Sequence, residues 1–333
     1  MISQGLKLAA VAAAAIGMSA PVLAQEKLIL TSMSPPNSAN SKFFAAWAGK
    51  INAAGGGTID IDMRDGNALA NYGNVYDRVV NNVIQIGWSI HQVVAGKFPL
   101  TDVGGLPYIT PDGATGAVAL WRLYKAGLLD AEYRDVMPLF LAPFPAGNIH
   151  YIKPPREYDD LRGLKVSSSG RTQAQMIDSL GGAAISLQPQ DLYEGLNRST
   201  VDAAIISWAG FAPYKLQEVT FFHLEGALGQ NTSMFFMSRQ RFAALPEKGR
   251  NAISDNVSEA QTRAFGAYFD DQAQQSRAPV AASDKHKVVR LTAQQSAAWE
   301  KRFAPVLAEW AKERAGGEAV LAAYRKEIAG LKK

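Results

Sequence analysis

Cysteine is absent from all 333 residues of this chain. Without cysteine there can be no disulfide bond, no thiolate metal ligand and no cysteine nucleophile, so three kinds of functional site are excluded at once. A protein without disulfides must be stabilised by its hydrophobic core alone, and a chain of this length can bury a large one. The absence is therefore compatible with an exported protein that does not depend on oxidation.

Motifs of the common enzyme classes are also missing. The sequence has no G-x-S-x-G, no H-E-x-x-H, no P-loop and no G-x-G-x-x-G after a predicted strand. The four histidines, His91, His150, His223 and His286, are far apart, and none has a carboxylate at metal-ligand spacing. We therefore expect no catalysis, no bound metal and no cofactor.

Charge is neither one-sided nor clustered. The formal net charge is +4, from 34 Lys and Arg against 30 Asp and Glu, and the basic residues are scattered. A nucleic-acid-binding surface needs a basic patch or stripe, so no nucleic-acid partner is expected. Beyond the N-terminal segment, no stretch approaches the ~18 consecutive apolar residues of a membrane-spanning helix.

The N-terminal residues 1–24 have the features of a signal peptide. Lys7 supplies a positive charge, and Leu8–Met18 is apolar or small throughout. Val22-Leu23-Ala24 then forms a cleavage site with small residues at its ends. We expect export to the periplasm with cleavage near Ala24. An uncleaved anchor or a buried first helix is the alternative.

Apolar periodicity predicts strands and helices in alternation. Alternating or short continuous apolar runs indicate strands, and apolar residues at helical spacing indicate helices. The predicted strands cover 28–33, 59–63, 84–90, 137–141, 149–152, 164–167, 185–187 and 203–206. The predicted helices cover 43–51, 75–83, 117–128 and 172–180, with another beginning near 191. This alternation predicts an α/β fold with mostly parallel sheets.

The order of the elements predicts two α/β lobes. The strand–helix units come in two rounds, and the first crossover falls near Phe144–Gly147. From Leu245 onward the pattern is helical, with one apolar stripe at Ile253, Val257, Ala260, Phe265 and Phe269. A long helix after two α/β units usually bridges them. We expect lobe I to contain residues 25–145 and 233–272, and lobe II to contain residues 146–232 and 273–333.

Three segments occur in a characteristic order. They are Tyr158-Asp-Asp-Leu-Arg-Gly-Leu-Lys-Val166, Val201-Asp-Ala-Ala-Ile-Ile-Ser-Trp208 and Tyr214-Lys-Leu-Gln-Glu-Val-Thr-Phe-Phe-His223. Their order and spacing resemble the solute-binding subunit of tripartite ATP-independent periplasmic (TRAP) transporters, the DctP-type family. The resemblance covers residues 27 to about 280, and it depends on the whole set because no single motif would suffice.

The resemblance implies both a fold and a role. The fold would be a two-lobe periplasmic binding protein, with a ligand cleft between the lobes and a long helix spanning them. The role would be to close on one small molecule and deliver it to a small and a large membrane permease subunit. Energy for transport would come from an ion gradient across the permease, and we expect the receptor itself to be monomeric.

The chain departs from the family at the position that matters most for an acidic ligand. The family's arginine that grips the ligand's carboxylate falls at Ser167 in this chain. The next residues lead into a helix that begins near Arg171, where hydroxyls, free backbone N–H groups and a cation could form an anion site. Arg171 could therefore replace the missing charge. The alternative is that these residues only cap the helix and that Arg171 is solvated.

Other candidate ligand contacts are aromatic or polar residues near strand ends. Trp208 and Phe211 follow a strand and could either form a pocket wall or pack near the hinge. Trp88 and His91 follow another strand, where a tryptophan could belong to the core or to the cleft. The resemblance adds residues from the first lobe and the crossover: Asn37, Tyr72, Phe144 and Asn148.

The chemical nature of the ligand stays open among three alternatives. Arg171, its helix N-terminus and His91 could jointly hold a carboxylate. A neutral or cationic ligand could instead stack against aromatic residues, namely Trp88, Trp208, Tyr72 and Phe144. The site could also have changed its role. The supply of aromatic residues favours an aromatic or otherwise apolar-bodied organic acid.

Two other functional classes remain open from the sequence. A periplasmic hydrolase could use Ser167–Ser169, although no basic partner for these serines can be argued from spacing. A binding protein that presents its ligand to a membrane sensor is the other possibility.

Overall fold

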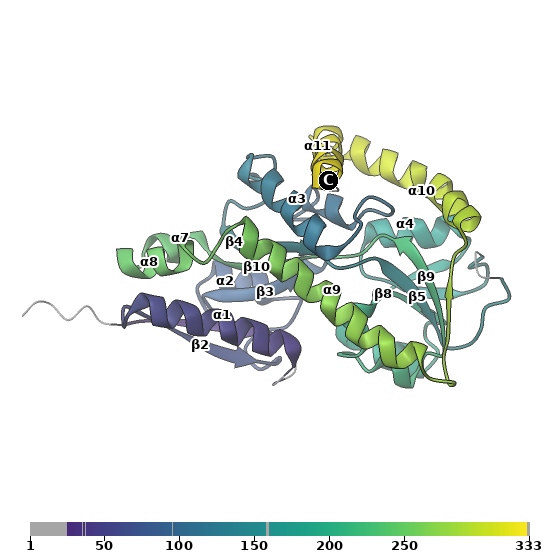
Figure 1. Cartoon of the computed structure of the whole chain (residues 1–333), viewed down its shortest axis with the longest axis horizontal. Coiled ribbons are helices and arrows are strands. Elements are labelled where there is room, and N and C mark those ends of the chain that lie inside the picture. The colour runs from purple at the N-terminus through teal and green to yellow at the C-terminus, as the bar shows by residue number, and fades with distance from the viewer. Residues whose placement is uncertain (1–24, 35, 37, 95, 158–159, 332–333) are drawn as a thin grey trace, which may run out of the picture.

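Two β-sheets lie at the centres of two lobes in a computed structural model of the chain (Figure 1). The structure describes residues 25–34, 36, 38–94, 96–157 and 160–331, so the predicted signal peptide and Asn37 lie outside the described residues. The first sheet has the order β2 (Ile59–Asp65), β1 (Glu26–Ser32), β3 (Ile86–Ile90), β10 (Thr232–Ser238) and β4 (Val136–Pro143). The second has the order β11 (Lys287–Arg290), β9 (Phe222–Leu228), β5 (Gly147–Tyr151), β8 (Ala203–Ser207), β6 (Lys165–Ser168) and β7 (Ala183–Ser186).

Both sheets are mostly parallel, as predicted, but each contains one antiparallel strand, β10 in the first sheet and β5 in the second. In the first sheet β1 is parallel to β2 and β3, whereas β10 is antiparallel to β3 and β4. In the second sheet β5 is antiparallel to β8 and β9, and the other pairs are parallel. The cause is that β4 runs into β5, and β9 into β10, through crossings of only three residues (144–146 and 229–231). β5 and β10 therefore enter their sheets directly, without the intervening helix that would bring the chain back in the parallel direction.

Helices cover the faces and ends of these sheets. The α-helices are α1 (Ala39–Gly55), α2 (Val75–Val80), α3 (Gly113–Lys125), α4 (Arg171–Ser179), α5 (Leu192–Asn197), α6 (Trp208–Phe211), α7 (Arg239–Ala243), α8 (Glu247–Ser254), α9 (Glu259–Ala281), α10 (Ala293–Glu313) and α11 (Gly317–Leu331). The 3-10 helices are η1 (His91–Val93), η2 (Thr101–Gly105), η3 (Pro189–Asp191) and η4 (Leu216–Glu218). Within the described part of the chain, no helix combines the length and the apolar character needed to cross a membrane.

Helix α1 forms where local sequence signals agree. The Ser38 side chain accepts a hydrogen bond from the backbone N–H of Ser41 and caps the first turn. Gly56 ends the helix in the left-handed region, with φ of 51°, which glycine adopts without a steric penalty. The predicted helix and its glycine stop are confirmed. Its buried face directs Phe44 and Trp47 into the core.

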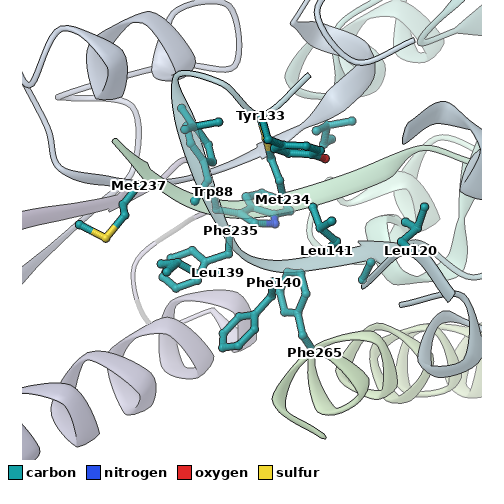
Figure 2. Close-up of a cluster of buried hydrophobic side chains, with 14 of the residues drawn as sticks. Trp88, Leu120, Tyr133, Leu139, Phe140, Leu141, Met234, Phe235, Met237 and Phe265 are labelled. Atoms are coloured by element: carbon teal, nitrogen blue, oxygen red, sulfur yellow. The ribbon is translucent and has the colours of Figure 1, made fainter. Parts of the chain in front are cut away.

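Stacked aromatic side chains join α1, the first sheet and α9 (Figure 2). The ring of Phe44 lies 4.7 Å from that of Phe235 in β10, and Phe235 lies 5.7 Å from Phe140 in β4. Phe140 in turn lies 5.6 Å from Phe265 in α9. All four rings are buried. Aromatic contacts of this kind contribute beyond simple burial, so α9 is fixed firmly to the first sheet.

The helical stripe after residue 245 forms two helices rather than one. Helix α8 ends at Ser254, and α9 begins after Ser258, whose side chain caps the backbone N–H of Gln261. Helix α9 then runs across the molecule, contacting β4 and α3 at one end and α6 and β11 at the other (Figure 1). The predicted lobe-spanning helix is therefore confirmed, with a later start.

The last two helices attach to different sheets. Helix α10 packs on α4 of the second sheet, whereas α11 packs on α3 and η2 beside the first sheet (Figure 1). Tyr324 and Ile328 of α11 are buried in the first lobe's hydrophobic core. The C-terminal helices thus make a further connection between the lobes.

Gly266 is expected to be essential for the packing of α9 on α3. A methyl group at this position would overlap the backbone of Gly113, because the two helices touch through these glycines. We predict that Gly266→Ala lowers the free energy of unfolding by about 1–3 kcal/mol, as overpacking does. Gly49→Ala is the matched control, since Gly49 is an exposed residue of α1 with open space around it. Urea denaturation would show whether only Gly266→Ala destabilises; equal stability of the two variants would refute the close contact.

Candidate functional site

A cleft opens between the two sheets, beside the crossings that join them. Its walls come from the loop after β1, the last residues of β3 and β8, both crossings and one face of α9. It encloses about 780 Å³ of empty space, part of it open to solvent. Ile90 and Ser207 mark the carboxyl ends of β3 and β8, which is where ligands bind in open α/β sheets.

Aromatic rings from both lobes and α9 surround this cleft. The Trp88 ring lies 5.9 Å from Tyr72 and 6.5 Å from Phe144, steeply inclined to each. Phe144 also lies 4.6 Å from Phe269. Among the described residues, the aromatic side chains that line the cleft are Tyr72, Trp88, Phe144, Tyr214, Tyr268 and Phe269. Such walls suit a flat apolar body held by a few polar groups.

Polar side chains at the N-terminus of α1 form one corner of the cleft, here named the α1 cluster (Ser34, Ser38, Asn40 and Tyr268). Asn40 accepts a hydrogen bond from the Tyr268 hydroxyl at 2.5 Å and donates one to Ser34 Oγ at 3.1 Å. The first backbone N–H groups of a helix have no partner inside it, and the helix dipole makes this end positive. The corner therefore favours an anionic or acceptor group.

A second polar group, the crossing cluster (Gln230 and Asn231), lies on the crossing between β9 and β10. Gln230 Oε1 accepts hydrogen bonds from the Asn231 backbone N–H at 2.8 Å and from Gln173 Nε2 at 3.2 Å. Ser169 Oγ donates to Asn231 Oδ1 at 2.8 Å. Gln230 Nε2 is buried and has no hydrogen-bond partner among the described residues. The crossing cluster is thus fixed from behind by α4.

None of the described residues that line the cleft carries a charge. In the second lobe, Glu225 accepts a hydrogen bond from Trp208 Nε1 at 3.0 Å and pairs with Arg277. Burial raises the pKa of Glu225, but the hydrogen bond and charge of Arg277, the hydrogen bond from Trp208 and the charge of Arg290 together outweigh it, so the pKa is lowered. Glu225 is therefore an ionised group held outside the cleft by its own partners.

Tyr72 and Tyr214 connect the two lobes across the cleft. Their hydroxyl oxygens are 3.0 Å apart, although the residues are far apart in sequence. Burial raises the pKa of Tyr214 to about 12 and raises the pKa of Tyr72 well above its usual value. Both hydroxyls are therefore protonated at neutral pH, so one can donate to the other.

Three residues predicted as ligand contacts line the cleft: Tyr72, Trp88 and Phe144. Trp208 and Phe211 lie behind the wall instead. Each packs within 5 Å, centroid to centroid, of the His150 ring, at 4.6 Å in both cases. They are directed there because Ser207 caps the short helix α6 and turns these side chains into the core of the second lobe.

The serine-to-arginine segment also lies apart from the cleft. Ser167 is buried within β6, and Arg171 forms ion pairs with Glu309 at 3.2 Å and Glu313 at 2.8 Å on α10. Arg171 lines a small hollow that also contains Asp102 and that shares Gln230 and Asn231 with the cleft. Arg171 already has two carboxylate partners, so it is not a free cation.

His91 and Asn148 are occupied by local hydrogen bonds. His91 Nε2 lies 2.8 Å from the Tyr133 hydroxyl, and burial lowers the pKa of His91 to about 3, so the ring is neutral at physiological pH. Asn148 Nδ2 donates to the backbone oxygen of Ala146 at 3.2 Å. Neither residue lines the cleft among the described residues.

Several lining residues were not predicted from the sequence. Asn40 lies just before the predicted helix 43–51, and Tyr214 belongs to one of the family-like segments, so weak signals existed for both. Gln230 and Asn231 are a polar pair just before the return strand, which is a weak signal. Tyr268 lies next to Phe269 of the helical stripe, and nothing in the sequence shows which side of α9 faces the cleft.

Solved structures of other proteins share this fold. A TRAP solute-binding protein from a marine metagenome, specific for aromatic acid ligands and in complex with metahydroxyphenylacetate, superposes with a TM-score of 0.86 at 21% identity, covering 93% of this chain and 100% of that one. A TRAP solute-binding protein from Rhodoferax ferrireducens T118 with copurified benzoate gives 0.85 at 24% identity, covering 91% and 98%. The two-lobe periplasmic binding protein fold is thereby confirmed.

Sequence comparison extends the similarity along most of the chain. The outer membrane transporter protein TsaT of Comamonas testosteroni is 27% identical over 250 residues, which is 73% of each protein. The family model of the bacterial extracellular solute-binding proteins, family 7, matches residues 30–313. This match includes both sheets, the cleft and the lobe-spanning helix, and it confirms the resemblance found in the sequence. The chain belongs to family 7 of the bacterial extracellular solute-binding proteins.

Proposed function

We propose that this chain is the extracytoplasmic receptor of a TRAP-type secondary transporter and that it binds an aromatic or otherwise apolar-bodied organic acid. The cleft supports this proposal most directly, because six aromatic side chains surround it and the N-terminus of α1 opens into it. The solved relatives with metahydroxyphenylacetate and benzoate have the same fold, which is consistent with such a ligand.

A carboxylate can be bound here without an arginine. Ala39 and Asn40, the first residues of α1, both line the cleft, and their backbone N–H groups have no acceptor inside the helix. Helix N-termini bind anions through such N–H groups together with the dipole. The α1 cluster would then take the role that the resemblance gives to an arginine at the position of Ser167.

Among the residues predicted from the sequence, we propose Tyr72, Trp88 and Phe144 as direct contacts. Asn37 precedes the capping residue of α1 and stays a prediction, because it lies outside the described residues. The remaining predicted residues we assign to packing or to hydrogen bonds outside the cleft: Ser167, Arg171, Trp208, His91, Asn148 and Phe211.

We propose that the protein works by closure of two lobes about the crossings. Lobe I would contain residues 25–145 and 233–272, and lobe II residues 146–232 and the chain from 273 through α10. Helix α11 would move with lobe I, because it packs on α3. Ligand need only bind the closed form more tightly to shift the equilibrium toward it.

The cellular setting follows from the family. Members are extracellular solute-binding proteins, and TRAP receptors bind small ligands for membrane permeases. We propose export to the periplasm with cleavage near Ala24, action as a monomer, and delivery to a small and a large permease subunit. No cofactor or nucleic acid is needed for this role.

A neutral aromatic ligand is the second candidate, since no charged side chain lines the described cleft. A thermal-shift screen of residues 25–333 separates the two. We predict stabilisation by aromatic carboxylates, because a ligand at ~100 times its Kd adds ~2.7 kcal/mol, a shift of several degrees. Aromatic alcohols, amines, aliphatic acids and sugar acids are the comparison set. Shifts with aromatic alcohols alone would contradict the acid.

Asn40→Asp tests the position of the carboxylate. The variant keeps the side-chain shape and the acceptor for Tyr268 but places a negative charge at the α1 cluster. We predict that benzoate-type acids bind at least tenfold more weakly, about 1.4 kcal/mol, while aromatic alcohols are less affected. Asn251→Asp adds the same charge at an exposed site on α8 and is the control. Calorimetric titration that finds equal acid affinity in both variants would exclude this binding mode.

Removal of the Tyr72–Tyr214 hydrogen bond should speed ligand release. We predict a larger dissociation rate for Tyr72→Phe and for Tyr214→Phe, because each loses the bond between the lobes. The double variant should release ligand no faster than the single variants, since one bond is lost in every case. Stopped-flow fluorescence can follow Trp88, whose ring lies 5.9 Å from Tyr72. Additive effects would mean that the two hydroxyls act separately.

A further inference from the structure

The two polar clusters of the cleft are separated by aromatic rings. Tyr268 of the α1 cluster lies 5.3 Å from Phe269, and Phe269 lies 4.6 Å from Phe144. The backbone N–H of Phe144 donates to the carbonyl of Asn231 in the crossing cluster at 3.0 Å. Phe269 and Phe144 therefore stand between the clusters. A ligand that spans the cleft meets polar groups at both ends and apolar rings in between.

We propose that the ligand is an aromatic acid with a second hydrogen-bond acceptor on its ring, such as a hydroxyl or a second carboxylate, and that Gln230 recognises this group. The proposal rests on the proposed function, in which the α1 cluster takes the first carboxylate. It adds a second contact that determines which aromatic acid is bound.

Gln230 lines the cleft, and its hydrogen bonds fix which of its amide atoms is the free donor. Its Oε1 already accepts two hydrogen bonds, from the Asn231 backbone and from Gln173, so the amide cannot be reversed without losing both. Its Nε2 has no partner among the described residues, although the side chain is only 7% exposed. A buried N–H without an acceptor is costly, so an acceptor supplied by the ligand would relieve that cost.

Gln173 is the positioning residue behind Gln230. It is 4% exposed, and its own orientation is fixed because Oε1 accepts the backbone N–H of Ser169 at 3.0 Å. Its Nε2 is thereby directed at Gln230 Oε1. Gln173 lies at the start of α4 and holds the Gln230 amide in one orientation. The Gln230 donor is therefore in place before the ligand binds.

The donor sets an order of ligand preference. A ring hydroxyl, carbonyl or carboxylate at the matching position can accept from Gln230 Nε2. An unsubstituted ring leaves the N–H unpaired, and a methyl group at that position also blocks it. Sites built to hydrogen-bond a substituent discriminate strongly against analogues that lack it. The chain is therefore expected to prefer hydroxylated or dicarboxylated aromatic acids over benzoate, and benzoate over toluates.

The test is a set of calorimetric titrations with benzoate, the three hydroxybenzoates, the three benzenedicarboxylates and the three toluates. For the mature protein, at least one hydroxybenzoate or dicarboxylate should bind at least about tenfold more tightly than benzoate. Gln230→Met should reduce this ratio to about one. Gln275→Met, at an exposed position of α9, is the matched control and should keep the ratio.

Two further variants distinguish the loss of the Gln230 donor from a general structural disturbance of the cleft. Gln173→Met should reduce the same affinity ratio, because it frees the Gln230 amide. Gln230→Glu keeps the shape but replaces the donor with a carboxylate, so it should weaken the binding of the dicarboxylates more than that of benzoate. If no aromatic acid binds the native protein, the proposed function fails. If benzoate binds but no substituted acid exceeds it, or if Gln230→Met keeps the ratio, only the role of Gln230 is overturned.

Discussion

The hydrogen bond from the Phe144 backbone N–H to the Asn231 carbonyl, at 3.0 Å, ties together the two short crossings between the lobes. On one side of it β4 pairs with β10, and on the other side β5 pairs with β9. The crossings therefore act as one connection. Because this connection forms the floor of the cleft, the residues that join the lobes also face the ligand. In the proposed mechanism, closure and recognition would share the same few residues.

The cleft achieves polarity without charge. Among the described lining residues there are hydroxyls and amides but no ionisable acid or base of the usual kind. The buried imidazoles nearby do not supply a cation either, since burial lowers the pKa of both His91 and His150 to about 3. A carboxylate in this setting depends on fixed N–H dipoles, whose effect is strengthened where water is excluded. Selectivity then comes from the placement of donors rather than from net charge.

Sequence patterns predicted most elements and the two-lobe fold, because strand alternation and helical stripes are local signals. They did not predict the antiparallel insertion of β5 and β10, which depends on how short the crossings are. In the site, Tyr72, Trp88 and Phe144, which were predicted as ligand contacts, line the cleft. The ion pairs of Arg171 could not be predicted from the sequence, because its partners lie on α10, far along the chain. Gln230 was missed because its value as a donor depends on tertiary hydrogen bonds.

The most direct test of a neutral, donor-based cleft is a crystal structure of the mature protein with 3-hydroxybenzoate. We predict a closed form with Tyr72 bonded to Tyr214, the ring beside Trp88 and Phe144, the carboxylate at the N-terminus of α1, and the hydroxyl or the opposite ring edge facing Gln230. A carboxylate bound to the Arg171 guanidinium, with Arg171 released from α10, would contradict it.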